Sequence, residues 1–219
     1  MRVAALIPVK PLDKALMRLA GLLDARVRHD LQAAMLTDIL VCCRRVLQIE
    51  CTIVVTSDLE AAEIATAHGA KVIADHSPPK GINAAVSRGL ETLSLPALVL
   101  MADLAGARPS DIEFVLANAL PSPGATLVRS LDRTGTNVML LCPPGVIEPH
   151  LGPGSLRRHL DQAKRQGVMV RVLDRPALSL DVDTPADIAV FMENPVDGAA
   201  RQVLTQAAVA GMLAAAAAT

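Results

Sequence analysis

Aromatic side chains are almost absent from this sequence. Its 219 residues include no tryptophan, no tyrosine and two phenylalanines, and its formal net charge is −1. Proteins that bind single-stranded nucleic acid stack bases on aromatic side chains, and nucleic-acid binders in general carry a basic surface. Because both features are missing, we expect no nucleic-acid partner. Any chemistry on phosphates would have to use a few individually placed cations.

Paired cysteines and long apolar runs are missing as well. The four cysteines show neither C-x-x-C spacing nor the pattern of a disulfide framework, which is typical of reduced thiols in the cytoplasm. No run approaches the roughly 18 apolar residues of a membrane span, and the apolar stretch near the N-terminus is too short for a signal peptide. We therefore predict a soluble cytoplasmic protein with no membrane partner.

Short apolar runs alternate with segments of helical periodicity through the first half of the chain. The apolar runs are residues 3–8, 52–56, 71–74 and 97–101, and the helical segments are 25–48, 59–68, 83–93 and 109–119. This alternation predicts an α/β fold of the Rossmann-like kind, with a mostly parallel central sheet and helices on both faces.

The second half of the chain has a different pattern. Two apolar runs, 125–130 and 137–142, are separated by a short polar turn, which predicts a small antiparallel insertion suited to a second substrate. A helix ending at residue 166, strands at 168–173 and 178–183 and a further helix follow. We predict one domain over residues 1–195 and an alanine-rich tail, 196–219, that is helical or disordered.

An acid stands at the end of the most apolar run. Residues 97–101 are all apolar, as in a central strand covered on both faces, and Asp103 follows where the chain leaves the sheet. Ligands of open α/β sheets bind at the carboxyl ends of the strands, and a carboxylate there can hold a divalent metal over a phosphate. A simple turn aspartate is the alternative.

Two further acids, Asp181 and Asp183, follow late in the chain. On the strand expected at 178–183 they would point to opposite faces, so only one could meet Asp103. We choose Asp183, which is the last residue before the next helix. Thr184 and Asp187 fit the N-cap and N3 positions of that helix.

Cations and anion-binding groups lie at other turns. Lys10 and Arg18 follow the first strand, where a phosphate-binding loop would lie, although solvated surface cations are the alternative. Residues 152–155, Gly-Pro-Gly-Ser, precede a helix and could form a nest of donors for a phosphate or carboxylate, or merely a glycine turn with a serine cap.

Three more polar residues are candidates for the same site. His159 lies four residues after Ser155 and shares its helical face, but a structural histidine is the alternative. Thr136 and Asn137 end the turn between the two apolar runs, where short polar side chains often only close a turn.

The order of these features favours a nucleotidyltransferase. A basic loop after strand one, an acid after a central strand, an anion nest and a second late acid would place two carboxylates around Mg²⁺. The metal and Lys10 would together offset charge on the α-phosphate of a nucleoside triphosphate.

Several motifs occur in order over residues 1 to 192. They are Ile7-Pro-Val-Lys-Pro-Leu12 with Arg18, Gly81-Ile-Asn-Ala-Ala85, Ala102-Asp-Leu104, Gly135-Thr-Asn137, Gly152-Pro-Gly-Ser155 with His159, and Asp181-Val-Asp-Thr-Pro185. With these motifs the chain resembles the guanylyltransferase family of coenzyme F420 biosynthesis, commonly called 2-phospho-L-lactate guanylyltransferases. The family is similar in fold to molybdenum-cofactor guanylyltransferases.

The resemblance implies transfer of GMP from GTP to a small phospho-acid with release of pyrophosphate, and a product passed to a downstream transferase of the pathway. It implies the following roles: Lys10, Asp103 and Asp183 catalytic, with Mg²⁺ on Asp103 and Asp183; Lys10, Arg18, Gly81 and Asn83 for GTP; and Thr136, Asn137, Gly152, Ser155 and His159 for the acid. The resemblance and the apolar tail leave a homodimer open.

Two departures from the family pattern bear on the substrates. Leu16 replaces a lysine of the first loop, with Lys14 nearby as compensation, and Leu151 replaces the usual phenylalanine before Gly152. The smaller Leu151 would give the acid more room, which favours 3-phospho-D-glycerate over phosphoenolpyruvate or 2-phospho-L-lactate. The alternatives are a non-catalytic GTP-binding module and a nucleotidyltransferase acting on a sugar phosphate or pterin.

Overall fold

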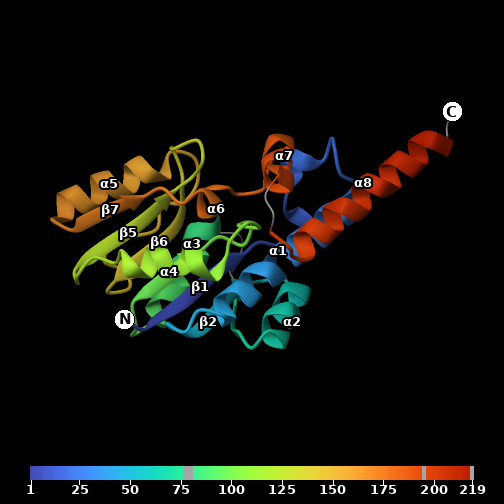
Figure 1. Cartoon of the computed structure of the whole chain (residues 1–219). Helices are drawn as coiled ribbons and strands as arrows, with labels where there is room; N and C mark the ends of the chain where they lie inside the picture. The colour runs from blue at the N-terminus through green and yellow to red at the C-terminus, as the bar shows by residue number, and fades with distance from the viewer. Residues whose placement is uncertain (76–80, 194–195, 218–219) are drawn as a thin grey trace.

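The computed structural model describes residues 1–75, 81–193 and 196–217 (Figure 1). The strands are β1 Val3–Val9, β2 Ile49–Thr56, β3 Lys71–Ala74, β4 Ala97–Leu100, β5 Gly124–Arg129, β6 Thr136–Cys142 and β7 Met169–Leu173. The helices are α1 Ala25–Arg44, α2 Leu59–Ala67, α3 Gly81–Glu91, α4 Pro109–Ala117, α5 Ser155–Gln166, α6 Pro176–Ser179, α7 Pro185–Glu193 and α8 Ala199–Ala217, with short 3-10 turns at Leu12–Lys14 and Met17–Leu19.

The seven strands form one sheet in the order β3-β2-β1-β4-β6-β5-β7. Strand β6 runs antiparallel to both of its neighbours, β4 and β5, whereas the other pairs are parallel. The predicted α/β fold with a mostly parallel sheet is therefore confirmed. The predicted antiparallel pair is part of this main sheet, because β6 lies between β4 and β5 and β5 continues in parallel to β7.

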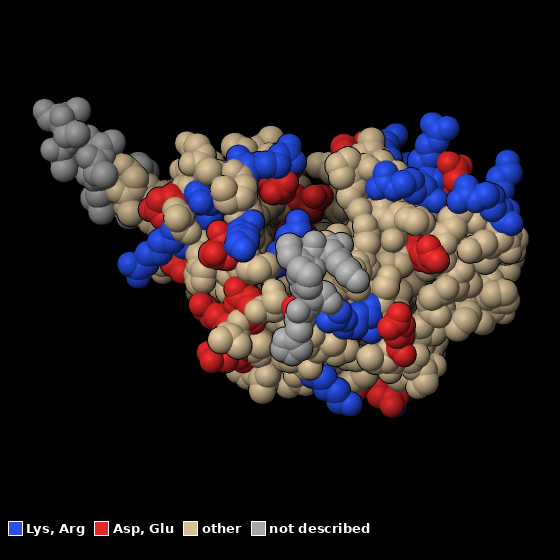
Figure 2. Space-filling view, turned by 180° about the vertical axis from the view of Figure 1, so that it is seen from behind, with Lys and Arg blue, Asp and Glu red and all other residues tan. Residues whose placement is uncertain are grey.

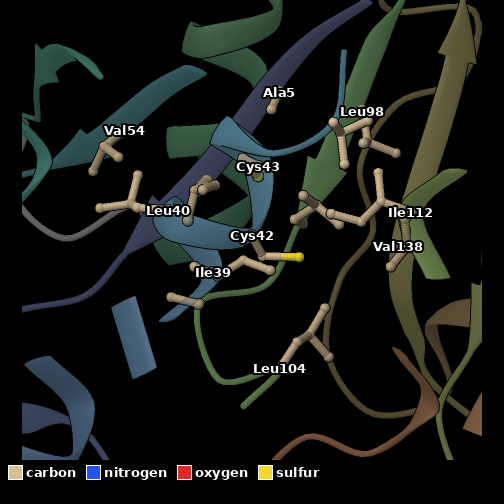
Figure 3. Close-up of a cluster of buried hydrophobic side chains, with 14 of the residues drawn as sticks. Ala5, Ile39, Leu40, Cys42, Cys43, Val54, Leu98, Leu104, Ile112 and Val138 are labelled. Atoms are coloured by element: carbon tan, nitrogen blue, oxygen red, sulfur yellow. The ribbon is translucent and has the colours of Figure 1, made fainter. Parts of the chain in front are cut away.

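Helices cover both faces of the sheet, as the unbroken burial of β1 requires, since successive side chains of a strand point to opposite faces. Ala5 and Ile7 join a core cluster with residues of α1, α2 and α4, while Leu6 joins a second cluster with residues of α3 and α5. Figure 3 shows the first cluster, in which the end of α1 places Cys42 and Cys43 among aliphatic side chains of the strands and of α4. All four cysteines are free, as expected.

A third apolar cluster lies beyond the sheet and contains the alanine-rich helix α8. Leu204 of α8 and Phe191 of α7 pack against Leu31 and Met35 of α1, and the C-terminal part of α8 extends away from the body of the molecule (Figure 1). Asp38 of α1 caps α8, because its carboxylate accepts from the backbone N–H groups of residues 199 and 200 at 2.8 and 2.9 Å. In the part of the chain that the structure describes, no helix combines the length and the apolar character needed to cross a membrane.

Two predicted elements are wrong in detail. Residues 178–183 do not form a strand: Pro176 starts the short helix α6, and Val182 then donates its backbone N–H to the Asp103 carbonyl at 3.1 Å instead of joining a ladder. Helix α1 ends at Arg44 rather than at residue 48. The periodicity was misleading there because Val46 is buried from a turn, not from the helix.

Candidate active site

A cavity of about 710 Å³ lies where β1 and β4 end and where β6 and α5 begin. Figure 2 shows acidic and basic side chains together beside a hollow in the molecular surface. The chain reaches this edge from both directions, because β6 starts next to the end of β4. The predicted site residues that line the cavity are Lys10, Arg18, Asp103, Thr136, Asn137, Gly152, Ser155 and Asp183.

Asp103 is the most perturbed acid of this cavity. Its Oδ1 atom is shielded from solvent and has no hydrogen-bond partner among the described residues. Burial, followed by the charges of Asp181 and Asp183, raises the pKa of Asp103 to about 7, and Lys10 opposes this shift. An orphaned, crowded carboxylate oxygen is costly in isolation, so its position favours a role in binding a cation.

The expectation that only one late acid could meet Asp103 is wrong. Asp181 and Asp183 both line the cavity and both raise the pKa of Asp103. The reason is that their segment is not a strand, so alternation does not separate them. Asn137 holds Asp181 in place, since its amide nitrogen donates to Asp181 Oδ1 at 3.2 Å and to the Ser179 carbonyl at 2.9 Å. Both N–H groups of Asn137 are used in this way, so the side chain orients an acid.

Asp183 is paired with a cation of the first loop. Arg18 Nη1 lies 3.0 Å from Asp183 Oδ2, and Lys10 lines the same cavity. The neighbouring Thr184 and Asp187 cap α7 as predicted, because Asp187 Oδ2 accepts from the Thr184 N–H at 2.7 Å and from its hydroxyl at 2.7 Å. This cap at the start of α7 therefore holds the backbone next to Asp183.

The start of α5 forms the opposite wall of the cavity. Gly152 and Gly154 have positive φ values of 114° and 68°, as the predicted glycine turn requires. The Ser155 N–H already donates to the Gly152 carbonyl, and the next amide donates to the Thr134 carbonyl. The Ser155 hydroxyl, however, is fully buried and has no partner within the described chain. The donor offered here is therefore a hydroxyl more than a nest of amides.

His159 lies behind this wall and does not line the cavity. It is fully buried, and its Nδ1 lies 3.0 Å from the Thr136 hydroxyl, which does line the cavity. Its Nε2 accepts the His150 N–H at 2.9 Å. Burial, with the charges of His150 and Arg158, lowers the pKa of His159 to about 4.

Asn83 and Gly81 also lie outside the main cavity. Asn83 holds the loop before α5, because it accepts the Leu151 N–H at 2.6 Å and donates to the Leu151 carbonyl at 3.2 Å. Gly81 lines an adjoining cavity of about 350 Å³ together with Lys10, Lys14 and other residues from the ends of β1 to β3. Leu16, which replaces the loop lysine, is buried in the third apolar cluster.

The turn between β5 and β6 contributes residues that sequence reasoning did not select. Ser130, Asp132 and Thr134 line the main cavity. Hydrogen bonds from the Ser130 hydroxyl at 2.5 Å and from Thr134 lower the pKa of Asp132 to about 2. A Cβ atom at Gly135 would stand 2.7 Å from Ser130 Oγ, so only glycine fits this tightly bonded turn.

Comparisons with known protein families and sequences match this chain to guanylyltransferases. A family model described as guanylyl transferase CofC like matches residues 3–210. The chain is 36% identical over 196 residues to a phosphoenolpyruvate guanylyltransferase of Sphaerobacter thermophilus, an alignment covering 86% of this chain and 91% of that protein. It is 37% identical over 193 residues to one of Rubrobacter xylanophilus, covering 86% and 93%.

Solved structures support the fold. A protein described as a nucleotide-diphospho-sugar transferase from Desulfovibrio desulfuricans superposes with a TM-score of 0.71 at 17% identity, covering 94% of this chain and 95% of that one. A CMP:2-keto-3-deoxy-manno-octonic acid synthetase in complex with CTP superposes with a TM-score of 0.60 at 15% identity, covering 94% and 99%. At these identities the likeness concerns the fold alone, but the family match extends over nearly the whole chain. The chain therefore belongs to the CofC-like guanylyl transferase family and is a guanylyltransferase.

Proposed function

We propose that the main cavity transfers GMP from GTP to a small phospho-acid, with phosphoenolpyruvate as the first candidate acceptor, and that the product enters coenzyme F420 biosynthesis. The observation that carries this proposal is the grouping of Asp103, Asp181 and Asp183 with Lys10 and Arg18 in one cavity. Such a grouping suits a metal-bound, highly charged triphosphate better than a neutral substrate.

Asp103 and Asp183 are the proposed ligands of Mg²⁺. The unpartnered, shielded Oδ1 of Asp103 fits a cation, which would also relieve the repulsion from the neighbouring acids. The described residues contain no group of three or more side chains arranged as a complete metal site. This is consistent with Mg²⁺, which is held by one or two carboxylates, substrate phosphates and water. When bound, the metal supplies charge neutralisation at the α-phosphate.

Lys10, Lys14 and Arg18 are the proposed contacts to the GTP phosphates. Lys10 lines both the main cavity and the adjoining cavity of about 350 Å³ that Gly81 lines, so it stands between the two. We assign the adjoining cavity to the nucleoside. In this arrangement Lys14 compensates for the loop lysine that Leu16 replaces, since Leu16 is buried elsewhere. Asn83 acts on the site through the Leu151 backbone.

The acid would bind against the start of α5 and β6. Thr136, Gly152 and Ser155 line the same cavity as the three acids. An oxygen of the acid's phosphate attacks the α-phosphorus in line, a new P–O–P bond forms and the bond to the β-phosphate breaks. The attacking oxygen is already anionic and the leaving pyrophosphate carries its own charge, so the chain needs to position the groups and offset their charge.

Two observations bear on which acid is the acceptor, and they favour different acids. The eight relatives compared with this chain, at 31–37% identity, are all phosphoenolpyruvate guanylyltransferases. Leu151 lines the cavity, so its side chain shapes the acid site and keeps 3-phospho-D-glycerate as the second candidate. 2-Phospho-L-lactate is the third acid to offer.

The test measures pyrophosphate release from GTP and Mg²⁺, with each of the three acids offered separately. We expect release with phosphoenolpyruvate, none without an acid, and none with Asp103→Asn. Arg157→Ala is the matched control, because Arg157 is exposed on α5 and pairs with Asp161 away from the cavity. Release with 3-phospho-D-glycerate alone would move the assignment to that acid.

GTP binding without turnover of any acid would instead support the non-catalytic module. Turnover of only a sugar phosphate or a pterin would support the larger acceptor. A homodimer and transfer of the product to a downstream transferase are part of the proposal and need their own measurements, by light scattering and by a coupled assay.

A further inference from the structure

We propose that His159 is a positioning residue that fixes the Thr136 hydroxyl as a hydrogen-bond donor toward the anionic group of the acceptor acid. This inference rests on the proposed function, because it deepens the role of the same site. It assigns to His159, which never reaches the cavity, an effect on substrate through one intervening hydroxyl.

The backbone of His150 sets the tautomer of His159. A backbone N–H can only donate, and the His150 N–H points at His159 Nε2 at 2.9 Å. Nε2 must therefore be the unprotonated, accepting nitrogen of the ring. In a neutral imidazole the other nitrogen, Nδ1, then carries the proton.

The surroundings keep the ring neutral. His159 is fully buried, and the positively charged Arg158 lies next to it in the sequence. Both burial and the nearby charge disfavour an imidazolium, and the pKa of His159 falls to about 4. Protonation would also break the bond from the His150 N–H, because Nε2 would become a donor. The Nδ1–H form is thus the one present at neutral pH.

The tautomer of His159 determines what Thr136 can do. Nδ1–H donates to Thr136 Oγ1 at 3.0 Å, so this bond occupies a lone pair of the hydroxyl and leaves its hydrogen for another partner. Thr136 is 5% exposed and lines the cavity, so that hydrogen is available to a bound acceptor. A hydroxyl that already accepts a hydrogen bond is also a stronger donor.

Ser155 provides a second hydroxyl group in this wall of the cavity, available to donate a hydrogen bond to the bound acid. Its hydroxyl lies one helical turn before His159, is fully buried and has no partner in the described chain. A Cβ atom added at Gly135, the neighbour of Thr136, would stand 4.0 Å from Ser155 Oγ, so Ser155 lies against the turn that leads into β6. One turn of α5 therefore offers one hydroxyl directly through Ser155 and a second indirectly through His159.

The first measurement uses the unaltered protein without substrates. The ¹⁵N chemical shifts of His159 in a long-range ¹H–¹⁵N spectrum distinguish the two neutral tautomers. We expect the Nδ1–H form at pH 7.5, with assignment through the backbone. The Nε2–H tautomer, or a protonated ring, would overturn the proposal. This arm does not depend on which acid is used, so it separates a failure of this inference from a failure of the proposed function.

The second measurement compares H159Q with H159N under steady-state conditions. In H159Q the side-chain oxygen can reach the Nε2 position and keep the bond from His150, but the donor to Thr136 is lost. In H159N the amide nitrogen can stand at the Nδ1 position and keep the donor. We expect the KM for the acid to rise about tenfold in H159Q, the factor for one hydrogen bond to a charged group, with the KM for GTP unchanged. H159N should stay close to the wild type.

The opposite order would overturn the proposal. If His159 only held the loop through His150, H159N would impair acid binding more than H159Q. The double mutant with T136V adds a further check, because H159Q should raise the KM for the acid no further once the hydroxyl is gone. Additive effects of H159Q and T136V would contradict a role through Thr136. R157A on the exposed face of α5 is the control for general damage to the helix.

Discussion

Acid should destabilise this protein through His159, and H159Q should remove most of that effect. The buried ring has its pKa lowered from the ordinary 6.5 to about 4, chiefly by burial and also by the charges of His150 and Arg158. The unfolded chain therefore binds one more proton than the folded chain between these two pH values. The contribution of the neutral His159 ring to the free energy of unfolding is fully present above pH 6.5 and is lost as the pH falls toward 4. The shift of about 2.5 pKa units corresponds to roughly 3 kcal/mol, of which about 2 kcal/mol is already lost at pH 5.

Urea unfolding at pH 8 and at pH 5 measures this effect, followed by circular dichroism. The free energy of unfolding of the wild type should fall by about 2 kcal/mol more between these pH values than that of H159Q. The other side chains are the same in both proteins, so their contributions cancel in the difference. H68Q is the control, because His68 lies at the end of α2 and its Nδ1 lies 2.8 Å from the Ile64 carbonyl of the same helix. Equal pH dependence of wild type and H159Q would refute the assigned environment.

Three further changes test other parts of the structure. Asp103→Asn should abolish pyrophosphate release yet raise the free energy of unfolding by about 1 kcal/mol, because a crowded carboxylate with an unpartnered oxygen is neutralised; lower stability would count against this account. Asp38→Ala should cost about 2 kcal/mol and increase hydrogen exchange in α8, since two capping bonds are lost, whereas Asp38→Asn should cost less. Gly89→Ala should cost about 2 kcal/mol, because the new Cβ would overlap a buried methyl group of Leu6; unchanged urea unfolding would refute that contact.

Much of the fold could be predicted, because the burial of a strand or helix determines the local order of its apolar and polar residues. The central strands β1 and β4 are buried on both faces, and their unbroken apolar runs show it. The segment at 178–183 misled because its alternation of apolar and acidic residues is also what a loop shows when Leu180 and Val182 pack into a cluster. These two residues are buried in the third cluster, away from any strand.

The site could be predicted where a residue follows a strand directly. Lys10 after β1 and Asp103 after β4 lie in the cavity for that reason. The contacts of Asn137 depend on partners far away in the chain. Those of His159 depend on which side of α5 a loop passes. Asn137 bonds to residues 42 and 44 positions later, and no local pattern carries that information.

The antiparallel strand β6 places the residues proposed to bind the acid within one stretch of the sequence. Because β6 starts where β4 ends, the groups proposed for the acid come from one continuous stretch, from Thr136 at the start of β6 to Ser155 at the start of α5. The cations proposed for the GTP phosphates, Lys10, Lys14 and Arg18, come from the loop after β1, before this stretch, whereas the proposed metal ligand Asp183 comes after it. An exchange of this stretch would change the groups proposed for the acid and leave Lys10, Lys14, Arg18 and Asp103 in place. Relatives that accept different acids would then be expected to differ mainly within this stretch.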